Sequence, residues 1–547
     1  MLGILSPLRI RLFRSVWLAN LIGSTGWLVQ GVGAAWLMTN LAGTPDMVAL
    51  VQTATLLPIL LFALLAGTLA DLWDRRLVLL LAQLWVSLAS AGLSLITGLG
   101  LATPAILLLF TFLIGTGAAL NGPAWQAVVR EIVPRDELAA AVTLNAIGFN
   151  LARALGPALG GVVVAAFGAE AAFALNVVAA LALAGVLLAW RRPPPRHELP
   201  RERLHLAVLT GLRYVAETSA IRAILARGAV FGLAASTALA LLPLIARDRL
   251  GGGPATYGLL LGAFGIGALL GAFLVHPLRQ ARGAEFVITF LSAAAGLAFL
   301  AIGLFATSFL TVGLALAIAG MAWLGSFSTF NISVQMSTAF WVQARVLALY
   351  QTIVFGSMAL GSWAWGEIAE RTSLEAAHLG AGGLLLASLL LHWRLPMPAG
   401  EAPDLQPAPK PEPLPPVREA AEEGPVLVQI EYEVGPADAP AFVAVMDEVG
   451  HLRRRNGALR WRLFQDVEDG EHWIEAFVLA DWTEHRRLRS RMTMADVALE
   501  ARAGAYHRGT KAPLRRYLIA RRHDSRYLLD AAEMAMPTSR SRRSQDA

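Results

Sequence analysis

The 547-residue sequence contains no cysteine, which excludes disulfides, thiol nucleophiles and cysteine metal sites. Charged residues are also few: they make up 15% of the chain, whereas soluble domains carry about 25%. Hydrophobic residues make up 56% of the chain, and the mean hydropathy is +0.56. These proportions indicate a protein that crosses a membrane many times.

The positive charge does not point to nucleic acid. The formal net charge is +6, but the arginines are spread over short loops and the C-terminal tail instead of one soluble face. The C-terminal histidines show no metal-ligand spacing, so we expect neither a metal nor another cofactor. These histidines are His451, His472, His485 and His507.

Twelve apolar runs are long enough to cross a bilayer core of about 30 Å, which takes roughly 20 helical residues. They lie near residues 16–40, 46–69, 77–99, 104–129, 139–166, 170–190, 223–246, 254–277, 284–305, 308–336, 346–369 and 374–395. Alternate loops carry most of the arginines, as cytoplasmic loops do. The sequence therefore predicts a multi-pass membrane protein, embedded in the lipid bilayer, with both termini cytoplasmic.

The loop at 191–221 is rich in proline and arginine and divides the spans into six plus six. Shifting the first half by roughly 205 to 210 positions aligns Asn121 with Asn331 and Arg135 with Arg345, an internal repeat. The pattern predicts an all-α polytopic membrane protein with two pseudo-symmetric six-helix bundles, at 1–190 and 222–395.

The composition changes after Leu395. Residues 396–425 form a proline-rich linker. Residues 426–520 then alternate between strand and helix patterns in the order β-α-β-β-α-β, with one strand near 426–434 and a second helix over 483–507. This order predicts a cytoplasmic α+β ferredoxin-like domain, followed by a disordered basic tail at 521–547. Regulation or self-association is the role we expect for this domain.

A charged turn at residues 67–76 lies between the second and third spans. Gly67 permits close helix packing, and Asp71 is suited to face the positive N-terminal end of a neighbouring helix. Arg75 and Arg76 follow, and Glu131 is the candidate partner of Arg75. The alternative is a basic loop that only sets the topology.

This turn resembles the signature loop of the major facilitator superfamily, although Leu72 and Asp74 depart from its pattern. A second stretch, in span five, is similar to a motif typical of exporters in that superfamily. It contains Gly156, Pro157, Gly160 and Gly161. The resemblance implies that these residues and the charged turn form a conformational gate; an ordinary packing kink is the alternative for span five.

The whole chain is most similar to the transmembrane secretion effector branch of that superfamily, which includes the enterobactin exporters. The resemblance is carried by residues 13–20, 121–135 and 156–161, and by 482–496 in the C-terminal domain. It implies a carrier of the bacterial inner (plasma) membrane that uses the proton-motive force to expel small siderophore-like or drug-like molecules by alternating access. An uptake carrier of the same fold is one alternative. A membrane-anchored enzyme with a monooxygenase-like C-terminal domain is another.

Polar residues inside spans are the default functional candidates, because burying them unpaired is costly. Arg153 leads, since it lies about four turns into span five, with either a gating or substrate role or a structural pairing. The other cavity candidates are Asn20, Trp27, Gln30, Gln52, Asn121, Trp125, Gln126, Asn145, Trp323, Asn331 and Gln335. For each of them a hydrogen bond between helices is the alternative. The sequence offers no membrane-centred acid to carry a proton.

Overall fold

The computed structural model describes residues 2–72, 74–134, 137–190, 204–398, 404–409 and 424–520. The chain divides into two compact units. The helical unit comprises residues 1–208, 220–337 and 344–402. The C-terminal unit comprises residues 209–219, 338–343 and 403–547, so it includes two connectors between long helices.

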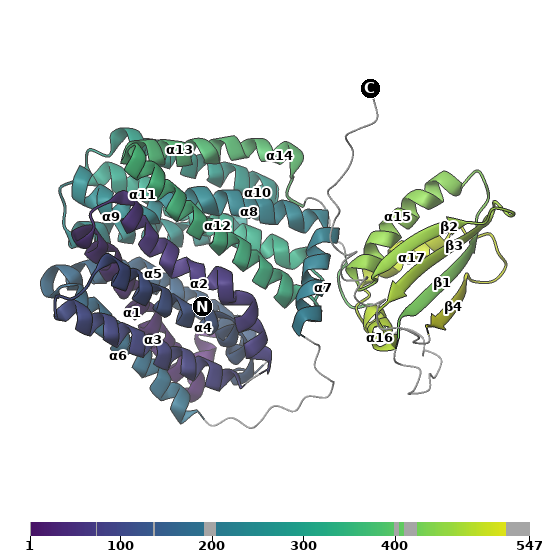
Figure 1. Cartoon of the computed structure of the whole chain (residues 1–547), viewed down its shortest axis with the longest axis horizontal. Helices are drawn as coiled ribbons and strands as arrows, with labels where there is room; N and C mark the ends of the chain where they lie inside the picture. Colours follow the sequence, from purple (N-terminus) through teal and green to yellow (C-terminus); the bar gives the residue numbers. More distant parts are fainter. Residues whose placement is uncertain are drawn as a thin grey trace. The chain divides into compact units, whose positions relative to one another are not determined.

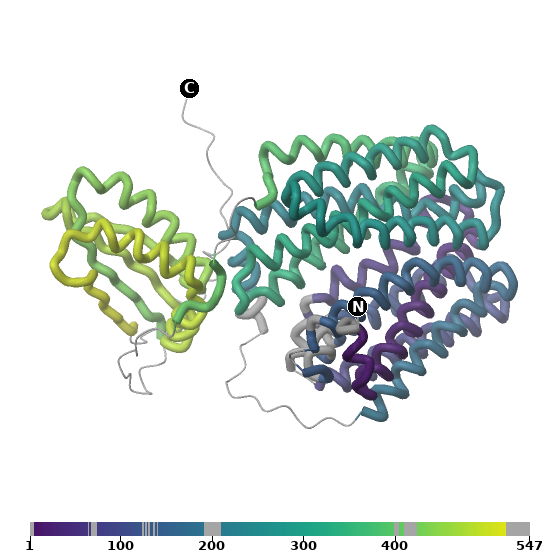
Figure 2. The backbone as a smooth tube through the Cα atoms, turned by 180° about the vertical axis from the view of Figure 1, so that it is seen from behind, coloured from purple at the N-terminus to yellow at the C-terminus, as the bar shows by residue number. Residues whose placement is uncertain are grey.

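Long helices that run alongside one another make up the helical unit (Figures 1 and 2). The N-terminal helices follow a short turn, η1 (Leu2–Arg9); they are α1 (Arg11–Leu41), α2 (Pro45–Leu72), α3 (Arg75–Gly98), α4 (Pro104–Ile132), α5 (Leu138–Phe167) and α6 (Ala169–Ala189). The C-terminal helices come after α7 (Leu204–Glu217); they are α8 (Ser219–Ala240), α9 (Leu242–Leu244), η3 (Ile245–Arg249), α10 (Pro254–Phe305), α11 (Phe309–Met336), α12 (Gln343–Arg371), α13 (Leu374–Ala387), η4 (Ser388–Leu390) and α14 (Leu391–Arg394).

Local sequence explains several helix boundaries. The side chains of Thr103, Ser308 and Ser373 each accept a hydrogen bond from a first-turn amide and so begin α4, α11 and α13. Inside α10, Gly283 has a φ of +81°, a conformation that glycine tolerates. This residue interrupts α10 between the two apolar runs predicted at 254–277 and 284–305.

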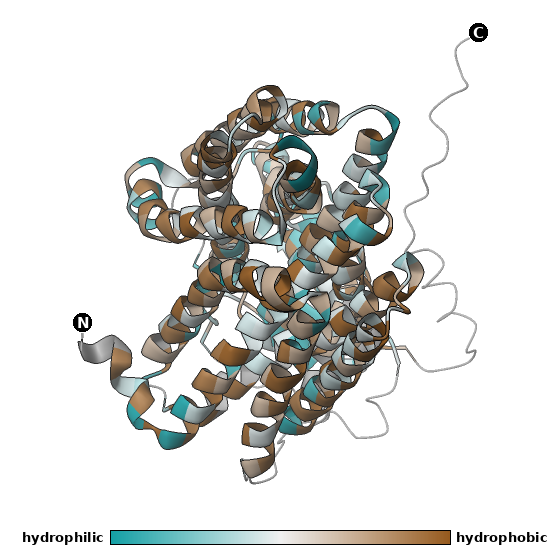
Figure 3. Ribbon diagram, turned by 90° about the vertical axis from the view of Figure 1, so that its left-hand side faces the viewer, coloured by the Kyte–Doolittle hydropathy of each residue, from teal (hydrophilic) through white to brown (hydrophobic). Residues whose placement is uncertain are grey.

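Apolar side chains also cover the outside of the helical unit. Leu88, Phe273 and Phe305 have exposed fractions of 70%, 76% and 59%. Hydrophobic residues continue along the whole length of the long helices (Figure 3). Within the described residues, ten helices are long and apolar enough to cross a membrane. Bilayer hydrocarbon accommodates such a surface, which would cause aggregation in water.

The C-terminal unit contains a four-stranded antiparallel sheet in the order β2-β3-β1-β4. Its strands are β1 (Val426–Glu433), β2 (Arg460–Gln465), β3 (His472–Leu479) and β4 (Leu514–Ile519). Alternate residues of β1 are buried, as their period of two predicted. They pack with Phe442 and Met446 of α15 (Ala439–Arg455) in one apolar core.

The prediction of one helix over 483–507 is wrong. The structure has two helices there, α16 (Trp482–Ser490) and α17 (Met494–Gly504). The Thr493 hydroxyl accepts a hydrogen bond from the Asp496 amide, and the Asp496 carboxylate accepts one from the Thr493 amide. This capping box starts a new helix inside a segment whose charges resemble one continuous exposed face.

The two connectors pack tightly within the C-terminal unit. Tyr214 of α7 is 1% exposed; its hydroxyl oxygen lies 3.0 Å from the amide nitrogen of Ala339, which donates to it, and its ring meets Trp341 edge-on. Glu217, at the end of α7, bonds to His451 and Arg454 of α15. The sequence predicted only a loop at 191–221 and did not reveal α7.

Candidate functional site

A cavity of about 190 Å³ lies in the helical unit between the N-terminal and C-terminal helices. The N-terminal helices α1, α2 and α5 contribute Trp27, Leu28, Gln30, Gly31, Val32, Ala34, Ala35, Val48, Val51, Gln52, Thr55, Leu56, Arg153 and Pro157. The C-terminal helices α8, α10, α11 and α12 contribute Leu239, Ala240, Tyr257, Leu261, Phe264, Trp323, Phe355 and Met358. A ligand in this cavity would touch both sets of helices.

The amide and cationic side chains of the cavity come from the N-terminal helices. Gln30 is 3% exposed, and its Nε2 atom has no hydrogen-bond partner among the described residues. A buried amide without a partner is costly, so this donor is available to a ligand. Thr55 is already satisfied, because its hydroxyl donates to the Val51 carbonyl 2.8 Å away.

Arg153 supplies the cationic group of the cavity. Its Cζ atom lies 5.1 Å from the centre of the Phe149 ring, one turn earlier on α5. It forms no ion pair with any residue that the structure describes. A guanidinium in this setting can meet an anionic or aromatic group of a ligand.

Aromatic rings form the opposite wall. Trp323 of α11 meets Phe264 of α10 edge-on, with ring centres 5.7 Å apart. Tyr257 of α10 stacks on Trp36 of α1 at 6.4 Å. The cavity therefore combines flat apolar surfaces with two amides and one guanidinium, an environment suited to amphipathic molecules.

Glycines bring α5 and α10 into backbone contact beside the cavity. A Cβ atom on Gly258 would lie 2.6 Å from the Pro157 carbonyl oxygen and 2.8 Å from the Gly161 Cα atom. A Cβ atom on Gly265 would lie 2.7 Å from the Arg153 carbonyl oxygen. This interface joins the two sets of helices without any side chain between them.

The other predicted span-five glycines face α1 instead. A Cβ atom on Gly156 would lie 3.0 Å from Leu28 Cβ, and one on Gly160 would lie 3.1 Å from Val29 Cα. The span-five motif thus divides its glycines between two neighbours: Gly161 contacts α10, whereas Gly156 and Gly160 contact α1.

Further contacts join the two sets of helices at the end of the unit where α2 begins. Arg247 donates to the carbonyl oxygens of Thr39 (2.5 Å) and Gly43 (3.2 Å). The Thr53 hydroxyl donates to the Ala359 carbonyl at 3.0 Å. We call this side of the helical unit the Arg247 end; the opposite side, where α3 begins at Arg75, is the Arg75 end.

The predicted gate at the Arg75 end is described only in part. The surroundings of Gly67 and the side chains of Asp71, Gln126 and Glu131 lie outside the described part of the structure. Arg75 begins α3, and Asp74 caps that helix by accepting a hydrogen bond from the Arg76 amide.

Arg76 has a partner that the sequence did not reveal. Its Nε atom donates to the Leu187 carbonyl at 2.7 Å and its Nη2 atom to Leu188 at 3.0 Å. A cation at the C-terminal end of α6 is favourable, because the helix dipole is negative there.

The structure brings Trp27, Gln30, Gln52, Arg153 and Trp323 together in the cavity. The other candidates lie elsewhere, as follows. Asn121 accepts a hydrogen bond from Gln83 of α3, and Asn331 accepts one from Gln335. Trp125 packs among apolar residues, Asn20 is half-buried, and the buried Oδ1 atom of Asn145 has no partner in the described part of the chain.

Sequence reasoning missed the cavity residues of α10. Tyr257, Leu261 and Phe264 follow one another at helical spacing and share one face of the helix. That spacing is a usable signal for a cavity-facing apolar stripe, which a criterion based on polar residues and tryptophans does not detect.

Comparisons with known proteins agree with this architecture. The profile of the transmembrane secretion effector family matches residues 2–524. The multidrug efflux pump Tap of Mycobacterium tuberculosis is 26% identical over 396 residues, which cover 69% of this chain and 92% of Tap. The enterobactin exporter EntS of Salmonella typhimurium is 26% identical over 389 residues, which cover 69% of this chain and 91% of EntS.

Solved structures share the helical fold at low identity. A bacterial homologue of the human lysosomal transporter Spinster, in an inward-facing and occupied conformation, matches with a TM-score of 0.55 and 14% identity, over 71% of this chain and 96% of that one. The nucleoside transporter NupG matches with a TM-score of 0.57 and 13% identity, over 70% of this chain and 99% of that one.

These relatives are transporters, which confirms the prediction that the chain is not an enzyme. With its many apolar helices, the chain is a multi-pass protein of the bacterial inner membrane. Since the family profile covers nearly the whole sequence, the chain belongs to the transmembrane secretion effector family of major facilitator superfamily transporters.

Proposed function

We propose that this protein exports small amphipathic molecules, siderophore-like or drug-like, across the inner membrane. The observation that carries the proposal is the cavity shared by both sets of helices, in which Gln30 and Arg153 face Trp323 and its aromatic neighbours. The names of the relatives Tap and EntS support export over uptake. Polar groups on one wall and rings on the other suit molecules with both characters.

The proposal includes twelve spans in two six-helix halves. The count adds α1 to the ten apolar helices and divides α10 at Gly283, where the backbone leaves helical geometry. Since the count is even, both termini lie on the same side, and the arginine-bearing alternate loops make that side the cytoplasm. In the C-terminal unit, the strand order β2-β3-β1-β4 with α15 after β1 supports a ferredoxin-like domain.

Transport proceeds by alternating access, driven by protons. The contacts of Arg247, and those of Gly161 with Gly258, support a conformation closed at the Arg247 end. That end is extracellular in the proposed topology, so this conformation faces the cytoplasm. The charged turn with Asp71, Arg75 and Glu131 would latch the Arg75 end in the opposite, outward-facing state.

Self-association through the C-terminal unit remains part of the proposal. The edge strand β4 carries Leu514 and Leu518 with exposed fractions of 50% and 48%. An exposed apolar edge can pair with a second copy. Mass measurement of the purified protein, with Leu518→Lys as the disrupting variant, tests this point.

Transport in inverted membrane vesicles tests the export proposal. Vesicles energised with a proton gradient should accumulate an amphipathic dye, and Arg153→Ala and Gln30→Ala should raise its KM. The loss of one hydrogen bond to a charged group is worth about 1.5–3 kcal/mol, roughly 10- to 150-fold in affinity. Gln280→Ala is the matched control, because Gln280 is exposed and lies outside the cavity.

Two results would contradict the proposal. If energised inverted vesicles accumulate none of a panel of dyes, drugs and siderophores, the export function is excluded. Accumulation only in right-side-out vesicles would establish the uptake carrier instead.

A further inference from the structure

The C-terminal unit encloses a second cavity, of about 280 Å³, beside the inner face of its sheet. Its apolar walls are formed by Val428 of β1, Phe477 of β3, Tyr517 of β4 and Leu488 of α16. The strand register places Val428 directly between Phe477 and Tyr517, so three neighbouring strands present one continuous apolar floor. Nothing in the transport mechanism uses this cavity.

His485 of α16 lines the cavity and has no partner. It is 3% exposed, and neither Nδ1 nor Nε2 forms a hydrogen bond with any part of the chain that the structure describes. Its ring lies against Trp482 and Tyr517, with ring centres 5.1 Å away in both cases. Burial and the nearby charges of Arg489, Arg453 and Arg515 lower the pKa of His485 to about 4.

A neutral imidazole offers one N–H donor and one acceptor. Both are unused in His485, and a buried polar group without partners is destabilising. Each ring nitrogen is therefore available to a polar group of a bound molecule.

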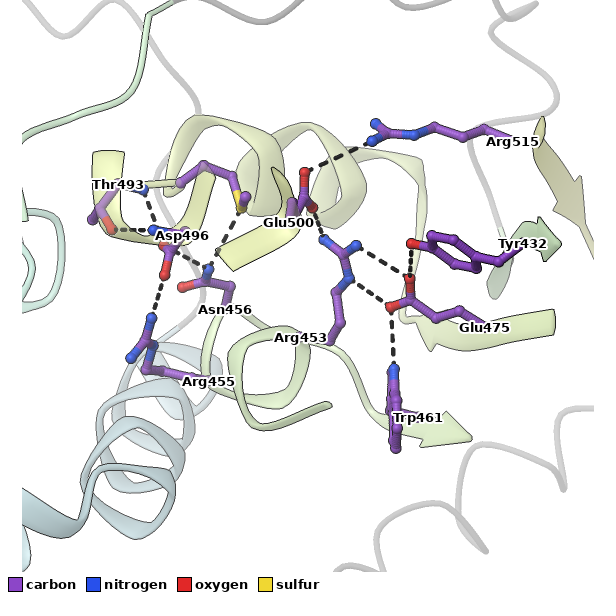
Figure 4. A network of polar contacts seen from close by, with 11 residues as sticks. Tyr432, Arg453, Arg455, Asn456, Trp461, Glu475, Thr493, Asp496, Glu500 and Arg515 are labelled. Atoms are coloured by element: carbon purple, nitrogen blue, oxygen red, sulfur yellow. Dashed lines mark hydrogen bonds and ion pairs between the residues drawn. The ribbon is translucent and has the colours of Figure 1, made fainter. Parts of the chain in front are cut away.

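Three arginines and one glutamate also line the cavity. Arg453 already forms two ion pairs. Its Nε atom lies 2.9 Å from Glu475 Oε1, and its Nη1 atom pairs with Glu500 (Figure 4). Arg515 lies 3.7 Å from the same Glu500 carboxylate. Burial opposes ionisation of Glu500, but the charges of Arg453 and Arg515 outweigh it and lower its pKa. The three cations face two carboxylates, which leaves one positive charge uncompensated.

Arg489 carries that surplus charge. It is half-buried at the cavity wall and forms no ion pair within the described part of the chain. A guanidinium presents paired donors that match a carboxylate. Arg489 lies one helical turn after His485 on α16, so the two side chains share one face of that helix.

A short segment of the proline-rich region closes the cavity. The Ala408 amide donates to the Met492 carbonyl at 2.9 Å, and the Met494 amide donates to Gln406 at 3.0 Å. Ala408 and Pro409 lie in the cavity wall. Backbone pairing therefore holds residues 404–409 as a strap beside the start of α17.

We propose that this cavity binds a small aromatic carboxylate. The ring lies on the floor made by Phe477 and Tyr517, the carboxylate pairs with Arg489, and an ortho hydroxyl or a carboxylate oxygen meets His485. The volume is near the lower end of ligand sites, about 300–1,000 Å³, so it accommodates one substituted ring and excludes larger drug-sized molecules. Inorganic phosphate is disfavoured, since it would leave the apolar floor uncovered.

Titration calorimetry on the full-length protein in lipid nanodiscs tests the site with salicylate, benzoate and benzamide as probes. Salicylate and benzoate should bind, and the uncharged benzamide should not. Arg489→Gln should weaken salicylate binding roughly 10- to 150-fold, the effect of losing a hydrogen bond to a charged group. The matched control is Arg502→Gln: Arg502 is exposed, pairs with Glu448 and lies outside the cavity, so affinity should not change.

A second measurement needs no variant. Hydrogen exchange at the Ala408 and Met494 amides should slow when salicylate binds, since the strap forms the cavity wall. The proposal is overturned if neither acid binds at millimolar concentration, or if Arg489→Gln binds salicylate as the parent does. It is also overturned if Gln30→Ala, and not Arg489→Gln, abolishes binding, because the acid would then occupy the cavity between the helices. Failure of this site leaves the export proposal intact.

Discussion

Gly258→Ala tests whether the α5–α10 contact closes the Arg247 end of the transporter. The new Cβ atom would lie 2.6 Å from the Pro157 carbonyl oxygen and 2.8 Å from Gly161 Cα, both backbone atoms that cannot rotate away. Overpacking of this kind costs about 1–3 kcal/mol. The cost falls on the conformation in which α5 and α10 touch, so the population open at the Arg247 end should rise roughly 5- to 150-fold.

Gly262→Ala is a closely matched control. Gly262 lies one turn later on α10, but its added Cβ atom would find Ala158 Cβ at 3.6 Å and the Ala154 carbonyl oxygen at 3.7 Å, ordinary contact distances. Both substitutions gain the same helix propensity, about 1 kcal/mol, which cancels in the comparison. The difference between the two variants therefore reports the interhelical contact alone.

The absence of cysteine makes the assay direct, since no native thiol has to be removed. A single reporter cysteine at Thr55, in the cavity wall, is labelled from the extracellular side with a membrane-impermeant maleimide. Labelling should be roughly 5- to 150-fold faster in Gly258→Ala than in Gly262→Ala, in proportion to the population that is open at the Arg247 end. Equal labelling rates at equal expression would refute the reasoning, because the contact would then persist in the open state.

Three further predictions follow from other contacts. Arg247→Ala removes donors to Thr39 and Gly43, each worth about 1 kcal/mol, and should speed the same labelling reaction by about tenfold or more; an unchanged rate would contradict this. Glu475→Ala leaves Arg453 without its fully buried partner and should destabilise the C-terminal unit by about 3–5 kcal/mol. Hydrogen exchange should show this as lost protection of the β3 amides. Unchanged protection would show that Glu500 alone is enough to neutralise Arg453. His485 has a folded-state pKa of about 4, below the ordinary value of about 6.5, so the unfolded state binds more protons between these pH values and stability should fall as pH drops through that window. The loss is on the order of 2 kcal/mol after solvent screening, and His485→Phe should remove this slope in a denaturation series from pH 7 to pH 4.

Much of the helical unit followed from the sequence alone. Runs such as 77–99 and 170–190 are predominantly apolar, and a chain in a bilayer must satisfy its backbone hydrogen bonds within each helix. Capping residues and glycines then set several helix boundaries: Thr103 begins α4, and Gly283 interrupts α10. The sequence therefore determined that the chain crosses a membrane and where most of its long helices lie.

The site was predicted less completely. Trp27, Gln30 and Arg153 were found because polar groups and tryptophans stand out in apolar helices. Composition did not distinguish them from Asn121, which instead bonds to Gln83 of the neighbouring α3. Both kinds of residue are intramembrane amides or cations, and only the rotation and packing of the helix decide which one faces the cavity.

The tertiary structure alone decided which glycines join the two sets of helices and which residues of the C-terminal unit share a cavity. Gly161 and Gly258 are 97 positions apart, and their contact depends on the packing of α5 against α10. The sequence showed only that His485 lacks metal-ligand spacing, whereas the tertiary structure places it beside Tyr517 and near Arg515. Sequence periodicity shows which face of an element is apolar, whereas the partner of that face is set by long-range packing, which a single sequence does not encode locally.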